Sequence, residues 1–219
     1  MSLPVLVHRA RKGAEEFRVI RPAEPLTRAA LIDHDRYLGA YLDGSAARGI
    51  AELWLLAARS PRSLVHVPLR ANGRPDGAVP GGAGSPLDLV LLHHSLQFAP
   101  SDWKRVRGRL GPGRPQTVSL PEAEGAAPAV DHAARHHREN RDLFHQHVHA
   151  ETLFMTGSAK VFRETAQHFL TVSREGPRHT PDDHGSTHFC TRLYGNAGIL
   201  GKDARELHIE YCDQWVTPV

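Results

Sequence analysis

The sequence predicts an α+β protein with a largely antiparallel sheet and a few packed helices. Short segments rich in β-branched and apolar residues recur along the chain, and Gly/Pro turns separate them. Two further segments, near 101–110 and 158–175, have apolar residues at helical spacing between recognisable helix ends. Several strands are expected to follow one another directly, which is the element order of an α+β fold.

The first region begins with two short β-rich segments, at 5–7 and 17–20. Residues 26–48 contain apolar side chains at helix-like spacing. Residues 50–56 and 63–69 predict the two strands of a β-hairpin, because a Ser-Pro-Arg turn separates two apolar runs.

Farther along, the Gly/Pro-rich residues 71–86 indicate a loop, and the apolar run at 87–93 indicates a buried strand. A short helix is expected from Ser101 to Gly111, followed by a strand at 116–120. The apolar face of that helix comprises Trp103, Val106 and Leu110.

The second region predicts a β-α-β-β unit, with strands at 147–155, 188–194 and 206–212. Its helix should begin after Gly157-Ser158 and end at Gly176-Pro177. The apolar face of this helix comprises Phe162, Ala166, Phe169 and Leu170. In the last strand, Leu207, Ile209 and Tyr211 alternate with His208 and Glu210, so the two sets should face opposite sides of a sheet.

Charge divides the 219 residues unevenly. Residues 1–120 hold 17 Lys+Arg against 10 Asp+Glu, a net +7, whereas residues 121–219 hold 10 against 14, a net −4. We therefore predict a basic β-rich region at 1–120, an Ala/Pro/His-rich linker or helix at 121–146, and the small β-α-β-β unit at 147–219. These regions are either two subdomains or one domain interrupted near 121–130.

A cytoplasmic location without membrane contact is expected. No apolar run approaches the roughly 20 residues of a membrane helix, and the first residues lack the pattern of a signal peptide. Cys190 and Cys212 each follow an aromatic residue, which favours buried, reduced thiols. The abundance of Arg, Ala, Gly and Pro is typical of a high-GC genome and weakens the argument that arginine was selected for nucleic-acid binding.

The last third of the chain resembles small actinobacterial immunity proteins that neutralise polymorphic toxins. The resemblance lies in Thr156-Gly157-Ser158 before the helix, Phe162-Arg163-Glu164-Thr165-Ala166 within it, the polar His-containing loop, and the segment 204–210. It implies an interaction protein without catalytic residues, and it transfers no site residues to this chain.

Histidines carry the most specific chemical signal, since six of the 16 lie between residues 131 and 149. Three of them, His145, His147 and His149, alternate along the chain. On a strand they share one face, and neighbours in that row are close enough to bind one metal. On a helix, His145 and His149 become the chelating pair instead.

A catalytic zinc usually needs three protein ligands, so the third would come from His208, Glu210, Glu151 or a loop residue. Glu151 or Glu210 would then act as the general base toward metal-bound water. Zinc or another transition metal is therefore the candidate cofactor, although a solvated polar face accounts for the same histidines.

Other candidate clusters are less specific. His132 and His136 have helical spacing, the segment 179–188 combines histidines with aspartates, and His93-His94-Ser95 follows a buried-type strand without a nucleophile motif. The basic segment around the predicted helix offers Arg105, Arg107, Arg109 and Arg114 to phosphates, although no nucleic-acid-binding signature accompanies it.

Three functions follow from these features. The uneven charge, the resemblance and the lack of a catalytic motif favour a cytoplasmic protein-interaction protein without its own catalysis, so a protein partner is expected. The alternatives are a metal-dependent enzyme that uses the histidine cluster and a nucleic-acid-binding protein that uses the basic helix. Whether the chain is an enzyme therefore stays open.

Overall fold

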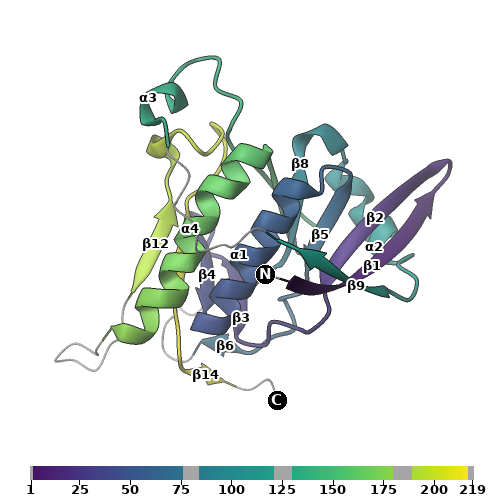
Figure 1. The fold of residues 1–219 in the computed structure, drawn as a ribbon, viewed down its shortest axis with the longest axis horizontal. Helices are drawn as coiled ribbons and strands as arrows, with labels where there is room; N and C mark the ends of the chain where they lie inside the picture. The colour runs from purple at the N-terminus through teal and green to yellow at the C-terminus, as the bar shows by residue number, and fades with distance from the viewer. Residues whose placement is uncertain (1, 76–83, 121–129, 180–188, 217–219) are drawn as a thin grey trace.

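A computed structural model describes residues 2–75, 84–120, 130–179 and 189–216 of the chain, and it confirms the α+β class (Figure 1). The predicted linker at 121–130 and the loop at 179–188 lie almost entirely outside the described residues. Within them, two mixed sheets carry most of the strands, and three of the strand pairs are parallel. Also within these segments, no helix combines the length and apolar character needed to cross a bilayer.

Sheet A has seven strands in the order β10-β11-β8-β5-β2-β1-β9. Its strands are β1 (Ser2–Lys12), β2 (Glu15–Pro22), β5 (Ser63–Val67), β8 (Asp88–His93), β9 (Arg114–Ser119), β10 (His145–His149) and β11 (Thr152–Gly157). The β1–β2 hairpin extends beyond the rest of the molecule as a two-stranded ribbon (Figure 1).

Sheet B has five strands in the order β12-β13-β4-β3-β7. Its strands are β3 (Ala29–Asp33), β4 (Leu38–Leu42), β7 (Ser85–Pro86), β12 (Cys190–Leu193) and β13 (Leu207–Tyr211). A small separate pair joins β6 (Arg74–Pro75) to β14 (Trp215–Val216).

The helices are α1 (Gly44–Arg59), α2 (Trp103–Arg107), α3 (His132–Arg135) and α4 (Ala159–Glu175). Short 3-10 turns occur at His94–Leu96, Pro100–Asp102, Gly176–Arg178 and Gly195–Ala197. Helix α2 covers one face of sheet A, where Trp103 and Val106 pack against Phe98 and Phe154.

The same order of elements, ββαββ, occurs twice along the chain, and these two units supply the central strands of both sheets. Strands β3 and β4, helix α1 and strands β5 and β8 form one ββαββ unit, with the short β6 and β7 inserted, and β10, β11, α4, β12 and β13 form the other. The last strand of each unit pairs in parallel with the second strand of the other, β8 with β11 and β13 with β4. Each sheet therefore contains strands from both units, so the predicted boundary at 121–146 does not separate two independent cores.

The two long helices pack side by side in front of the sheets (Figure 1). Each begins at a side-chain cap: Asp43 accepts from the Ala46 amide at 2.7 Å, and Ser158 accepts from the Val161 amide at 3.2 Å. Ser173 Oγ near the end of α4 donates to the Gly44 carbonyl at the start of α1, which makes the helices antiparallel.

Three predicted elements were wrong. Residues 50–56 form the middle of α1 instead of a strand. Within that window Glu52 alone is polar, and the polar stripe that also contains Ser45, Arg48 and Arg59 shows its period only over the full helix. Residues 26–48 form the β3–β4 hairpin and the start of α1. The single strand predicted at 147–155 is the β10–β11 hairpin, which turns at Ala150 and Glu151 with φ of 49° and 57°.

Other predictions were confirmed. The strand at 87–93, the helix after Ser158 and its apolar face all occur as expected, and Phe162, Ala166, Phe169 and Leu170 are buried. Of the two thiols, Cys212 is buried as predicted, but Cys190 is exposed because it lies on the edge strand β12.

Candidate functional site

The face of sheet B that points away from the main core gathers aromatic and charged residues that lie far apart in the sequence. Along β4 and β13, Leu38, Leu207 and Ile209 point into the core, so the intervening side chains of Tyr41, His208 and Glu210 project from the opposite face. The turn between β3 and β4 sits beside β13, because the Leu38 amide donates to the Glu206 carbonyl.

Three rings stack in a row on this face. The Tyr37 ring lies between the rings of His34, at a centroid distance of 4.7 Å, and His208, at 4.6 Å. Beside them, the Arg192 guanidinium lies 4.4 Å over the Tyr194 ring. We call the surface formed by His34, Tyr37, Arg192, Tyr194, Glu206 and His208 the ring face.

Tyr41 supports the ring face from below. It is fully buried, and its hydroxyl lies 3.1 Å from His34 Nε2. Burial, together with the Glu210 carboxylate, raises the pKa of Tyr41 far above its ordinary value. Burial also lowers the pKa of His34, against the attraction of Asp33. Both shifts favour the uncharged forms of the two groups, and the hydrogen bond between phenol and imidazole holds the two side chains in place.

Gly39 makes this contact possible. A Cβ atom at this position would come within 2.8 Å of Tyr41 Cε2 and 3.1 Å of His34 Nε2. Any larger residue would therefore displace the Tyr41–His34 pair, so the glycine in β4 is part of the construction of the ring face.

Carboxylates flank the exposed end of the stack. Glu206 Oε2 lies 3.7 Å from His208 Nε2, and Glu210 Oε1 lies 4.0 Å from His208 Nδ1. Glu206 also lies 3.9 Å from Arg192. The side chains of Arg192 and Glu206 are 44% and 41% exposed, so a partner molecule could reach both.

The predicted histidine cluster has a different setting. His145, His147 and His149 lie on the edge strand β10, which selects the strand alternative over the helical pair. The rings of His147 and His149 are 6.2 Å apart. His208 belongs to sheet B and does not join them, and the described part of the chain holds no group of three or more His, Cys, Asp or Glu side chains arranged to bind a metal.

The two predicted acid/base residues also separate. Glu151 occupies the β10–β11 turn, where it pairs with Arg70 and is 65% exposed. Glu210 lies beside His208 on the other sheet. His132 and His136 are exposed at α3, and His93 Nδ1 lies 2.8 Å from Ser95 Oγ at the end of β8.

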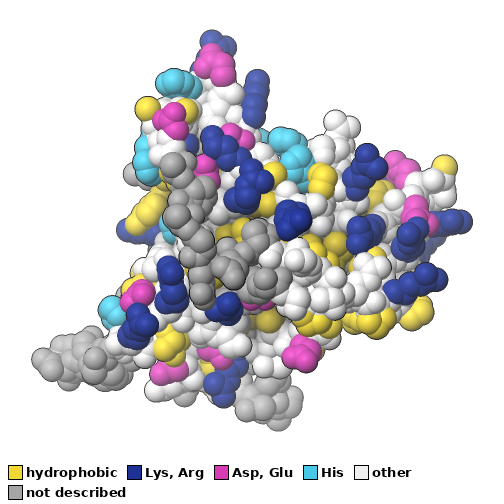
Figure 2. All heavy atoms as spheres, in the orientation of Figure 1, with side chains coloured by type: hydrophobic (Ala, Val, Ile, Leu, Met, Phe, Trp, Pro, Cys, Tyr) yellow, Lys and Arg dark blue, Asp and Glu magenta, His cyan; other side chains and the backbone are white. Residues whose placement is uncertain are grey.

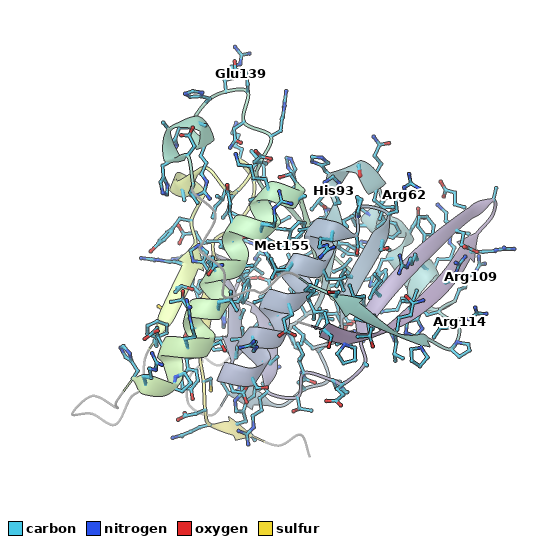
Figure 3. All side chains as sticks on the ribbon, viewed as in Figure 1. Arg62, His93, Arg109, Arg114, Glu139 and Met155 are labelled. Atoms are coloured by element: carbon cyan, nitrogen blue, oxygen red, sulfur yellow. The ribbon has the colours of Figure 1, made fainter. Side chains whose placement is uncertain are left out.

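The four predicted arginines do not form one surface. Arg107 is held by the buried Asp88 at 3.4 Å, and Arg105 is exposed on α2. Arg109 donates to the Arg11 carbonyl, whereas Arg114 lies opposite Val7 on β9. Figure 3 places Arg109 and Arg114 at the end of the molecule that carries the β1–β2 ribbon.

Asp88 is the centre of a buried polar group under α2. Its Oδ1 accepts from the Leu69 and Arg70 amides at 3.0 Å, and its Oδ2 faces His66 and Arg107. Burial acts to raise the pKa of Asp88, but the neighbouring His66 ring and the hydrogen bonds from the two amides outweigh it and hold the pKa below its ordinary value. Asp88 and His66 are almost fully buried in this group, and Arg107 covers them from the surface.

No protein-family model, curated protein or solved structure matches this chain significantly. Sequence reasoning found His208 and Glu210 through their alternation in the last strand, but it missed His34, Tyr37 and Tyr41. The one local feature that could have indicated any of these three residues is the Asp-His-Asp-Arg-Tyr sequence at 33–37, which places a histidine and a tyrosine in a polar turn.

Proposed function

We propose that this protein binds another protein through the ring face and that its partner presents a basic surface. The observation that carries the proposal is the stack of the three partly exposed rings of His34, Tyr37 and His208 at the margin of sheet B. Tyrosine and arginine are enriched among the residues that dominate protein–protein binding energies, and both occur here within one partly exposed cluster.

Rigidity supports a binding role. The Tyr41–His34 hydrogen bond holds one end of the stack from below. Arg205 holds the turn that carries Tyr37 through a two-pronged ion pair with Asp33. Side chains that are fixed before binding lose little conformational entropy when a partner covers them, and this raises affinity without additional contacts.

Charge favours a basic partner. Glu206 and Glu210 flank the stack and Asp35 is exposed in the adjacent turn, while Arg192 and the exposed Arg36 offset two of these three negative charges. The positive charge of Arg205 is already paired with Asp33, so one negative charge remains in excess. The acidic character agrees with the net charge of −4 for residues 121–219. Complementary charge would accelerate encounter and select among partners.

The class of partner to test first is a toxin domain, in keeping with the resemblance of the C-terminal third to immunity proteins. A cytoplasmic location belongs to the same proposal. Binding by surface complementarity requires no metal and no nucleophile, so His145, His147 and His149 provide a convenient control surface on sheet A.

The test compares two double variants of the tagged full chain in extracts of the source cells. Tyr37→Ala/His208→Ala removes two rings from the ring face, and His147→Ala/His149→Ala removes two rings from the edge of sheet A. Wild type and the β10 variant should retain the same stoichiometric partner, and the ring-face variant should retain at least about tenfold less, the loss of a single hot spot. A partner held equally by the ring-face variant, or lost with the β10 variant, would overturn the proposal.

A further inference from the structure

The β1–β2 ribbon and β9 carry a basic groove at the far end of sheet A. The groove encloses about 720 Å³ and is lined by Arg9, Arg11, Arg18 and Arg114 with Glu16 and Gln116. Figure 2 shows Lys and Arg side chains gathered over this end of the molecule. The ring face lies on the other sheet, so the groove is a separate surface.

Strand register brings the arginines together. Arg9 on β1 lies directly opposite Arg18 on β2, and Arg114 on β9 lies opposite Val7, two residues from Arg9 on the same strand. Side chains two apart share a face, and diagonal neighbours on adjacent strands are about 7–8 Å apart. The three guanidinium groups therefore form a row across β2, β1 and β9.

This row is unfavourable for folding by itself. Like charges directly opposite each other on neighbouring strands destabilise a sheet. Glu16 neutralises only part of the charge, since its carboxylate pairs with both Arg9 and Arg11. Among the described residues, neither Arg18 nor Arg114 has an acidic partner, and Arg18 contacts only the Gln116 amide oxygen. A cluster that costs stability and is neutralised only in part by Glu16 indicates a ligand that supplies negative charge.

We propose that this groove binds the phosphate backbone of a nucleic-acid duplex. Guanidinium groups match phosphate oxygens in a two-pronged geometry, and a two-stranded β-ribbon has dimensions that the major groove admits. The lining contains no aromatic side chain on which the bases of a single strand could stack. Nor does a large apolar side chain stand exposed beside it, as insertion into lipid requires, since those exposed in the described segments are Val148 and Val216.

The proposed contacts differ from those of the basic helix that the sequence suggested. Arg107 is occupied by Asp88, so α2 offers fewer available cations than its sequence implies. Arg114 alone of the predicted four lines the groove, and Arg109 reaches its border through the Arg11 carbonyl. Because the contacts are to phosphates, binding should depend on salt and little on base sequence.

The test measures fluorescence anisotropy of labelled DNA and RNA duplexes of about 20 base pairs with the full chain, from about 50 to about 200 mM salt. Four phosphate contacts predict a slope of log Kobs against log salt concentration of about −3 to −4. Arg9→Ala/Arg18→Ala/Arg114→Ala should reduce the magnitude of the slope by about 2.7 and weaken binding at least about tenfold at low salt.

The matched control is Arg138→Ala/Arg163→Ala/Arg174→Ala, which removes the same charge from exposed positions elsewhere. This control variant should keep most of the slope of log Kobs against log salt concentration. The midpoint of thermal unfolding, measured for each variant, checks that it is folded. If both triple variants lost the same duplex affinity and the same salt dependence, net charge alone would explain the effect, and the proposed binding groove would be wrong. No duplex binding at low salt, tighter binding of single strands, or arginine-dependent binding of phosphatidylserine vesicles without duplex binding would each overturn the duplex proposal.

Discussion

Arg205 donates to both carboxylate oxygens of Asp33, at 2.5 and 2.9 Å, and so joins two segments that lie 172 residues apart. The same guanidinium donates to the Asp35 carbonyl at 2.9 Å. The β3–β4 turn that carries His34 and Tyr37 is thereby held against the start of β13, which carries His208. The ring face exists because these two segments meet.

Replacing Arg205 should destabilise the protein and loosen the ring face. Arg205→Ala is expected to lower the free energy of unfolding by about 1–3 kcal/mol, because it removes charge-assisted hydrogen bonds to a carboxylate that is mostly buried. Urea unfolding at neutral pH measures this change. Arg141→Ala, at an exposed position, should change the same free energy by less than about 0.5 kcal/mol. Equal changes in the free energy of unfolding for the two variants would show that the contact between Arg205 and Asp33 does not stabilise the protein.

The contact between the two long helices gives a second prediction. Trp54 Nε1 donates to Thr165 Oγ1 at 2.9 Å inside the core. Thr165→Val keeps the shape of the side chain but leaves the indole N–H buried without an acceptor, at a cost of about 1–3 kcal/mol. Thr165→Ser keeps the acceptor and loses one methyl group, so its cost should be about 0.8 kcal/mol. If serine proved as damaging as valine in thermal or urea unfolding, packing rather than the hydrogen bond would join the helices.

Acid should unfold the protein through its buried carboxylates. The Arg205 hydrogen bond lowers the pKa of Asp33, and the hydrogen bonds to Asp88 lower its pKa despite burial. Because both folded-state pKa values lie below the unfolded-state value of about 4, their stabilising effect is complete above about pH 5 and is lost as the pH falls through the folded-state values.

Asp88→Asn isolates one of these contributions. At pH 7 it should lower the free energy of unfolding by about 1–3 kcal/mol, since Arg107 and His66 lose a charged acceptor. Carboxylates of the wild type become protonated as the pH falls from 5 to 3. Over this range the free energy of unfolding of the Asp88→Asn variant should fall less steeply than that of wild type. Parallel pH curves for the two proteins would contradict the assigned shift.

Replacing one arginine of the Arg9–Arg18 pair should stabilise the protein and weaken its binding to a duplex. Arg18→Thr removes one of two like charges that face each other and introduces a side chain that suits strands. It should raise the free energy of unfolding by about 0.2–1 kcal/mol while weakening duplex binding. A destabilised Arg18→Thr protein would show that the arginine row is tolerated for a structural reason instead.

Much of the fold could be predicted where local pattern and burial agree. Helix α4 has a clear apolar stripe and a Ser158 cap, and β13 alternates between core and surface. Helix α1 was missed because it is buried on most of its circumference. The β10–β11 turn was missed because Ala150 and Glu151 adopt positive φ without the Asn or Gly that usually marks such a turn.

The candidate sites could be predicted only in part, because they depend on pairings between distant segments. His208 and Glu210 followed from alternation within one strand, whereas His34 and Tyr37 reach them only through the parallel pairing of β4 with β13. Arg114 was identified from its sequence neighbours, but Arg9 and Arg18 join it through the β1–β2–β9 register. Neither pairing leaves a local signature in the chain.

The most direct test of the proposed ring face is photo-crosslinking in the source cells, with a photoreactive residue at one position at a time. Position 206 lies on the ring face, and position 147 lies on the edge of sheet A, and both side chains are accessible. A discrete protein adduct from position 206, absent from position 147 and lost when Tyr37→Ala is added, is the predicted result. An adduct from position 147 alone, or no adduct from position 206, would contradict the assignment of the ring face as the protein-binding site.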